Sequence, residues 1–132
     1  MAKRKNSRNK GAVGERELAA VLNELFGTKA RRGQQYNGLE GEDVVGLPGI
    51  HVESKRVQAL NIDKAIDQAS DDSKNVKVPA VFHRKNHRPW LVTVKLHDLE
   101  KFVLAMRKII EERDNANKAD IVTQVNDLKG DS

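Results

Sequence analysis

Two short β-like runs, joined by a Gly-Leu-Pro-Gly turn, carry charged residues where strands usually carry core residues. The first run, residues 43–45, begins with Asp43, and the second, residues 50–56, contains Glu53 and Lys55. Because side chains alternate between the faces of a strand, His51, Glu53 and Lys55 are predicted to share one face. Carboxylate oxygens bind hard divalent ions, and a fixed ammonium steadies developing negative charge. The pattern therefore favours hydrolysis of a phosphodiester assisted by Mg²⁺.

The register of this hairpin decides which acid lies across from Glu53. An even number of loop residues brings Glu42 there, whereas an odd number or a bulge brings Asp43. Both therefore stay candidates for the first metal ligand. An exposed hairpin with a Glu–Lys pair, worth at most about 1 kcal/mol, would explain the same residues without a metal.

A further carboxylate lies on the apolar face of a helix predicted at residues 12–26. At 100° per residue, Glu15 falls near the middle of this face, within about 60° of Leu18, Ala19, Leu22 and Phe26, while Glu17 points to the opposite, solvated side. A buried glutamate must be paired, neutral or coordinated, unless its place in the first turn lets it reach water. The apolar residues of this helix are Leu18, Ala19, Leu22, Leu25 and Phe26.

The other elements follow from hydrophobic periodicity and from turn residues. Asn61 is a plausible N-cap for the second helix, and His97 or Asp98 opens the third. The order is helix, three strands, helix, two strands and helix, which predicts an α/β fold with a mixed sheet flanked by helices. The predicted ranges are a strand at 29–32, a loop at 33–42, a helix at 62–73, strands at 78–84 and 89–96, and a helix at 98–113.

Length and composition restrict the class of protein. A chain of 132 residues is long enough for one domain with its own core. It has no cysteine, so disulfides, thiolate metal sites and cysteine nucleophiles are excluded. We find no signal peptide and no membrane-spanning run, and we expect a soluble, cytoplasmic protein without a membrane partner.

The positive charge is concentrated at one end of the chain. Residues 1–10 hold five bases and no acid, while the remainder carries 19 bases and 19 acids. A basic, flexible arm on a neutral body suits a polyanion such as DNA, although the same bases could serve solubility alone. We therefore divide the chain into the arm at 1–10, a body at 11–113 and a tail at 114–132, which could be helical.

The motifs in this order resemble the PD-(D/E)XK nuclease superfamily. The matching segments are KGAVGERE with Glu15, Asp43-Val44-Val45, Glu53-Ser54-Lys55, and a helix containing Gln68. The opening segment is most similar to archaeal-type Holliday junction resolvases and related phage nucleases. Glu42 stands where that family usually has a proline before the first acid.

The resemblance implies a restriction-endonuclease-like core and a role for each matching position. Asp43 and Glu53 would bind Mg²⁺ or Mn²⁺ with the main-chain carbonyl of Ser54, and Lys55 would be the catalytic lysine. Glu15 would complete the acidic cluster. Gln68 would assist from the second helix. Members of the resolvase branch act as homodimers on branched DNA, in a bacterial or phage-infected cytoplasm.

Contacts to DNA are predicted from position rather than from a motif. The loop before the hairpin is basic, polar and rich in glycine, which suits phosphate contacts and stacking by an aromatic ring. His51 and His83 lack the ligand spacing of a zinc site, and Trp90 is expected in the core. The predicted DNA-binding residues are Lys3, Arg4, Lys5, Arg31, Arg32, Gln34, Tyr36, Arg56 and Arg88.

Together these patterns and the resemblance predict a Mg²⁺-dependent DNA endonuclease, and the resemblance implies most specifically a Holliday junction resolvase. Two alternatives stay open. One is a nonspecific or structure-tolerant nuclease with the same site, since nothing in the sequence encodes the shape of a junction. The other is a nucleic-acid-binding protein without catalytic activity, in which the acids form an ordinary charge network.

Overall fold

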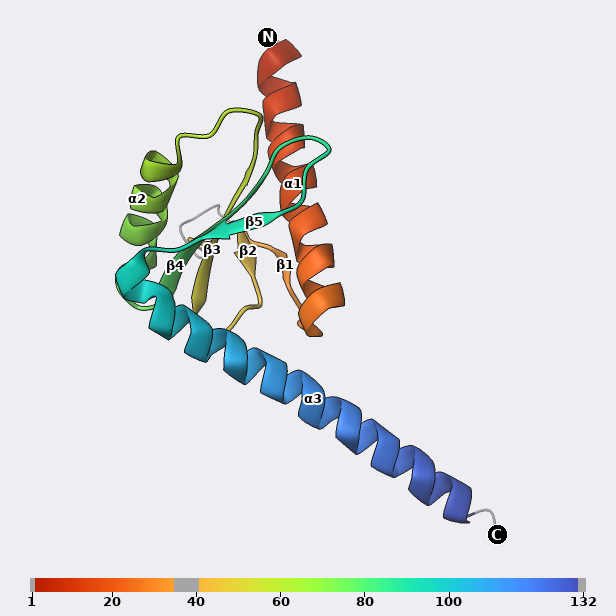
Figure 1. Cartoon of the computed structure of the whole chain (residues 1–132). Coiled ribbons are helices and arrows are strands. Elements are labelled where there is room, and N and C mark those ends of the chain that lie inside the picture. Colours follow the sequence, from red (N-terminus) through yellow and green to blue (C-terminus); the bar gives the residue numbers. More distant parts are fainter. Residues whose placement is uncertain (1, 35–40, 131–132) are drawn as a thin grey trace.

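The computed structural model describes residues 2–34 and 41–130, and for residues 2–10 it describes the backbone alone. The predicted order of helices and strands is confirmed (Figure 1). In chain order the elements are α1 (Ala2–Phe26), β1 (Arg31–Arg32), β2 (Val44–Val45), β3 (Ile50–Arg56), α2 (Ile62–Ser73), β4 (Val78–Arg84), β5 (Leu91–Thr93), the 3-10 turn η2 (Leu96–Asp98) and α3 (Leu99–Gly130).

The strands form one mixed, open sheet in the order β1-β2-β3-β4-β5. β3 and β4 are parallel, and the other neighbouring pairs are antiparallel. A parallel pair needs a crossover, and α2 supplies it by connecting the end of β3 to the start of β4. The predicted α/β class with a mixed sheet is therefore confirmed.

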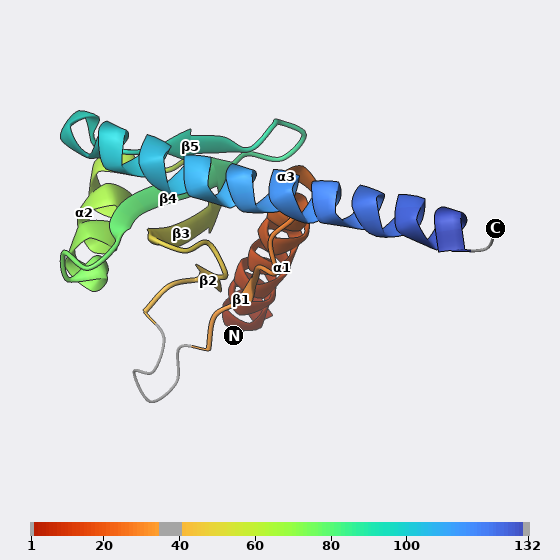
Figure 2. The same ribbon diagram turned by 90° about the horizontal axis from the view of Figure 1, so that it is seen from below.

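Helices cover both faces of the sheet (Figures 1 and 2). On one face, Leu18 and Leu22 of α1 and Ile109 of α3 pack against Val52 and Phe82 of the central strands. On the opposite face, α2 packs Ala65, Ile66 and Ala69 against Val81 of β4. Beyond the sheet, α3 continues as a long projecting helix whose residues 114–130 are all exposed.

A tight turn joins β2 and β3. The amide of Ile50 donates to the carbonyl of Leu47 at 3.1 Å, and Gly49 has φ 82°. Proline followed by a glycine with positive φ is the arrangement of a type II turn. Val44 pairs with Val52, so the loop has an odd number of residues and the next position outward brings Asp43 across from Glu53. Of the two registers that the sequence allows, the structure adopts this one.

Several helices and strands begin or end at other residues than predicted. Strands β1 and β5 are shorter than predicted, and β2 begins at Val44 rather than at residue 43. α1 begins at Ala2, so its backbone runs through the segment that we expected to be a flexible arm. α3 continues through the tail to Gly130 instead of ending near Arg113. Among the described residues, no helix combines the length and the apolar character needed to cross a membrane.

Candidate metal centre

Asp43 and Glu53 lie opposite each other on the buried face of the β2–β3 hairpin. Asp43 is 9% exposed and Glu53 is 2% exposed. The amide of Asp43 donates to the carbonyl of Val52 at 3.0 Å, and its Oδ2 accepts from the amide of Ser54 at 2.9 Å. These bonds to β3 hold the Asp43 carboxylate in place beside Glu53.

This arrangement makes ionisation of Glu53 unfavourable. Burial raises the pKa of Glu53, and the neighbouring charge of Asp43 raises it further. The side chains of His51 and Lys55 act in the opposite direction. A buried pair of like charges is relieved by a nearby cation or by a proton on one of the two carboxyls. Both a proton and a cation are therefore favoured at this site.

Lys55 occupies the predicted position on the same face of β3. Its Nζ lies 3.8 Å from Oε1 of Glu53, and its side chain is 31% exposed. That separation permits Coulombic attraction but is too long for a hydrogen bond. Lys55 can therefore contact both Glu53 and a molecule that approaches from solvent.

Glu15 is paired, as its place on the apolar face of α1 requires. Its Oε2 accepts from Nε of Arg32 at 2.5 Å, and its side chain is 16% exposed. Burial raises the pKa of Glu15, and the charge of Asp43 contributes to this rise. Glu15 thus belongs electrostatically to the acidic group, while its carboxylate is held by β1.

Glu17 is not the solvated residue that we predicted. Its carboxylate accepts from Arg84, lies 3.4 Å from Nε of Arg56, and accepts from Nε1 of Trp90 at 3.2 Å. These contacts join α1 to β3, β4 and the segment before β5. Trp90 is partly buried against the core, as expected.

His51 was dismissed as a metal ligand, yet it lies between two carboxylates. Its Nδ1 is 3.8 Å from Oε1 of Glu42, and its Nε2 is 3.8 Å from Oε2 of Glu53. Glu42 is in turn held by Lys77, whose Nζ lies 2.7 Å from the same Oε1. His51 is 2% exposed, so its polar ring is enclosed in the protein. The alternation of the strand predicts His51 on the face of Glu53, and that placement is the sequence signal for its role.

Asp72 of α2 completes a group with His51 and Glu53. Among the described residues, these three are the group of histidine or acidic side chains whose ligand atoms all lie within 4.8 Å of one another. Glu15, Asp43 and Glu53 do not form such a group. Asp72 is exposed, whereas the other two are buried. The group is therefore reachable from solvent at the C-terminal end of α2.

The remaining predicted site residues are less closely tied to this group. Gln68 is exposed on α2, one turn before Asp72, so Asp72 is the residue of α2 that reaches the cluster. Ser54 takes part through its amide, and a role for its carbonyl stays a prediction. His83 pairs in register with Lys55 across β3 and β4, and its Nε2 is hydrogen-bonded to Oγ1 of Thr93 at 2.9 Å.

The predicted DNA-binding residues fall into different environments. Arg31, Gln34 and Arg88 are exposed. Arg32 and Arg56 have acidic partners on α1, which are Glu15 and Glu17 respectively. Tyr36 and the side chains of Lys3, Arg4 and Lys5 lie outside the described residues.

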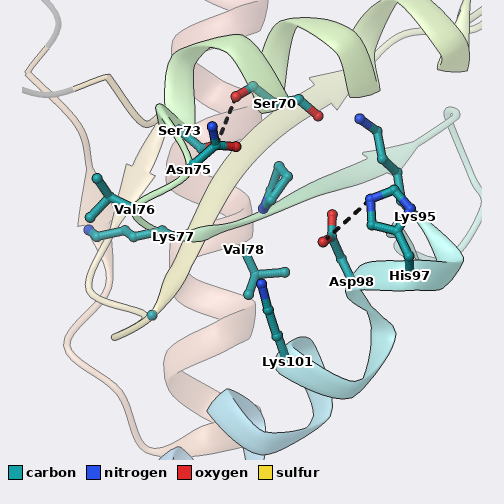
Figure 3. A pocket seen from close by; sticks show the side chains of 12 residues that line it. Ser70, Ser73, Asn75, Val76, Lys77, Val78, Lys95, His97, Asp98 and Lys101 are labelled. Atoms are coloured by element: carbon teal, nitrogen blue, oxygen red, sulfur yellow. Dashed lines mark hydrogen bonds and ion pairs between the residues drawn. The ribbon is translucent and has the colours of Figure 1, made fainter.

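The structure also contains a basic pocket that we did not predict (Figure 3). Lys77 comes from the segment before β4, Lys95 from the segment before η2, and Lys101 from α3. Ser70 and Ser73 of α2 line another side, and among the described residues Oγ of Ser70 has no hydrogen-bond partner. Lys77 also contacts Glu42, so it connects this basic pocket to the acidic cluster.

No family model matches the chain, and neither the curated proteins nor the solved structures contain a significant match.

Proposed function

We propose that this chain is a Mg²⁺-dependent DNA endonuclease with a restriction-endonuclease-like fold, acting on branched DNA such as a Holliday junction. The observation that carries the proposal is the buried pair Asp43 and Glu53, facing each other across a hairpin with Lys55 3.8 Å from Glu53. One partly exposed ammonium 3.8 Å away compensates the buried Glu53 carboxylate only in part. A divalent cation would complete the compensation.

Each residue of the group has a role in phosphodiester hydrolysis. Asp43 and Glu53 would hold Mg²⁺ or Mn²⁺, which lowers the pKa of bound water and polarises the phosphate. The amide of Ser54 orients Asp43. Lys55 would steady negative charge on the phosphate as water adds to phosphorus, one P–O ester bond breaks and the leaving oxygen takes a proton. Glu15 would influence the site through its charge.

Binding of DNA is supported by the charge distribution. The chain carries a net charge of +5, and three lysines surround a pocket beside the acids. Lysines on a surface bind phosphates by releasing condensed counterions. The exposed apolar residues Ile121, Val125 and Leu128 of α3 support a homodimer, which would offer one site to each of two strands. We expect the enzyme in a bacterial or phage-infected cytoplasm.

One cleavage assay tests the proposal. Equal amounts of a four-way junction, duplex DNA, single-stranded DNA and RNA are incubated with the full chain in Mg²⁺ or in EDTA. We expect cutting of the junction in Mg²⁺ alone, no cutting by Glu53→Ala, and a sharply slower rate for Lys55→Ala. Asp67→Ala, which removes an exposed acid from α2, is the matched control and should cut normally.

Each outcome points to one interpretation. Equal cutting of junction and duplex would indicate a structure-tolerant nuclease with the same site. Binding with no cutting, unchanged between Mg²⁺ and EDTA, would indicate a nucleic-acid-binding protein and reject the enzyme. Cleavage by Glu53→Ala equal to that of the unmodified chain would reject the assigned site.

A further inference from the structure

We propose that His51, Glu53 and Asp72 form a second cation site, which binds a transition-metal ion such as Mn²⁺ or Zn²⁺. Their ligand atoms lie within 4.8 Å of one another. An imidazole nitrogen with two carboxylates is a ligand set suited to Mn²⁺ or Zn²⁺, whereas Mg²⁺ prefers oxygen ligands and water. This site differs from the Asp43–Glu53 pair in its ligands and in the metals that it favours.

Two buried polar atoms face each other at this site. Among the described residues, Nε2 of His51 and Oε2 of Glu53 have no hydrogen-bond partner. They lie 3.8 Å apart, which is too far for a hydrogen bond between them. Two ligand atoms that each sit about 2.1 Å from one ion are separated by roughly 3–4 Å. One ion between them would satisfy both atoms.

The surroundings of His51 favour metal binding through Nε2. Glu42 lies on the Nδ1 side of the ring at 3.8 Å, and Lys77 holds Glu42 in place at 2.7 Å. Metal-bound histidines commonly direct their other ring nitrogen toward a carboxylate, which fixes the tautomer. At 3.8 Å Glu42 is too far for a hydrogen bond to Nδ1, so in this structure it acts on the ring through its charge alone.

The fold places two buried ligands of the proposed site on a central strand and one exposed ligand on a helix. β3 is the middle strand of the sheet and supplies His51 and Glu53, both 2% exposed. α2 runs back across the sheet, so its last turn brings the exposed Asp72 to the beginning of β3. An ion could enter past Asp72 and bind to two fixed ligands.

Glu53 is common to this site and to the proposed catalytic pair. Its Oε1 lies 3.8 Å from Lys55, and its Oε2 lies 3.8 Å from His51. The two oxygens thus face different partners, and Glu53 could bridge two ions. Binding at the second site does not depend on nuclease activity, because His51 and Asp72 lie outside the proposed catalytic group.

Metal binding to the tag-free, full-length chain tests the inference directly. After removal of metals, Mn²⁺ or Zn²⁺ alone is titrated by calorimetry. We expect binding by the unmodified chain and at least about tenfold weaker binding by Asp72→Asn and by His51→Gln. Asp71→Asn, the adjacent exposed acid on the same helix, should bind as the unmodified chain does.

A spectroscopic measurement separates a bound imidazole from a general loss of charge. Electron spin echo of bound Mn²⁺ should show coupling to an imidazole nitrogen, and His51→Gln should remove it while Asp71→Asn keeps it. Since Asp72 is exposed, Asp72→Asn tests the site even if His51→Gln fails to fold. No binding, or equal binding by Asp72→Asn and the unmodified chain, would overturn the inference.

Failure of this inference is distinguishable from failure of the proposed function. Mg²⁺-dependent cleavage without binding that depends on His51 and Asp72 would reject the second site and retain the nuclease. Binding that depends on both residues, without cleavage of any nucleic acid, would retain the second site and reject the nuclease.

Discussion

The two faces of β3 show what folding requires and what it does not. One face carries Ile50 and Val52, which pack into the main core against α1 and α3. The other carries His51 and Glu53, equally buried but with polar atoms that lack hydrogen-bond partners. Burial of apolar groups stabilises a fold, whereas burial of unsatisfied polar groups opposes it. The polar face is therefore better explained by ligand binding than by stability.

The largest expected effect is on catalysis from the polar face. Asp43→Ala should reduce the cleavage rate about 1,000-fold or more in Mg²⁺, because a lost ligand removes several kcal/mol of transition-state stabilisation. DNA binding, measured by anisotropy, should be retained or strengthened, since a negative charge near phosphate is gone. A variant that cuts at the normal rate would remove Asp43 from the site.

A stability comparison of the two faces comes next. Ile50→Ala on the apolar face should lower the free energy of unfolding by about 2–5 kcal/mol, from lost burial and a residual cavity. Glu53→Gln on the polar face should leave it unchanged or raise it near neutral pH in EDTA, because it removes a buried charge. Urea denaturation of both variants measures the difference. Equal losses would show that both faces serve stability.

The pH dependence of stability gives a sharper test of the buried charge on the polar face. Burial raises the pKa of Glu53, so the folded state binds this proton more tightly than the unfolded state does. The tighter binding of this proton raises the free energy of unfolding. The contribution is complete below the ordinary glutamate pKa of about 4.3, and it is lost as the pH rises through the raised pKa of Glu53 in the folded state. Without metal, the unmodified chain should therefore lose stability relative to Glu53→Gln over that interval. Adding Mn²⁺ should reduce this loss, since the ion competes with the proton. A difference that is independent of pH would contradict the assigned burial of charge.

The smallest expected effect is on DNA affinity, and it should leave the cleavage rate nearly unchanged. Lys101→Ala in the basic pocket should weaken DNA binding a few-fold and reduce the salt slope of log affinity by about 1, if the lysine contacts a phosphate. Cleavage at saturating DNA should be little changed. Lys118→Ala on the exposed part of α3 is the control. An unchanged salt slope for Lys101→Ala would exclude this pocket from the DNA interface.

The elements were predictable where one local rule dominated. The second helix has the predicted bounds because Asn61 accepts from the amide of Lys64 at 3.1 Å and an apolar stripe follows. The register of the hairpin was not predictable, because a type II turn at Pro48 and Gly49 alone would pair Leu47 with Ile50 and make the loop even, whereas the observed pairing of Val44 with Val52 needs one extra residue before the turn. The helical start at Ala2 was not predictable either, since residues 3–10 contain no apolar residue to mark a face.

The candidate site was only half predictable. Asp43, Glu53 and Lys55 are neighbours on one hairpin, so alternation and pairing bring them together. Asp72 is far along the chain from β3, and its approach depends on how α2 crosses back over the sheet. Nothing in the local sequence encodes that path. The role of His51 emerges only when its closeness to Asp72 and Glu42 is seen in the structure.

A crystal of the full chain soaked in Mn²⁺ tests the central claim most directly. The account predicts an anomalous peak about 2.2 Å from a carboxylate oxygen of Glu53, shared with Asp43, with His51 and Asp72, or with both pairs. A map with no anomalous peak near β3, and with these side chains turned away from one another, would contradict the account.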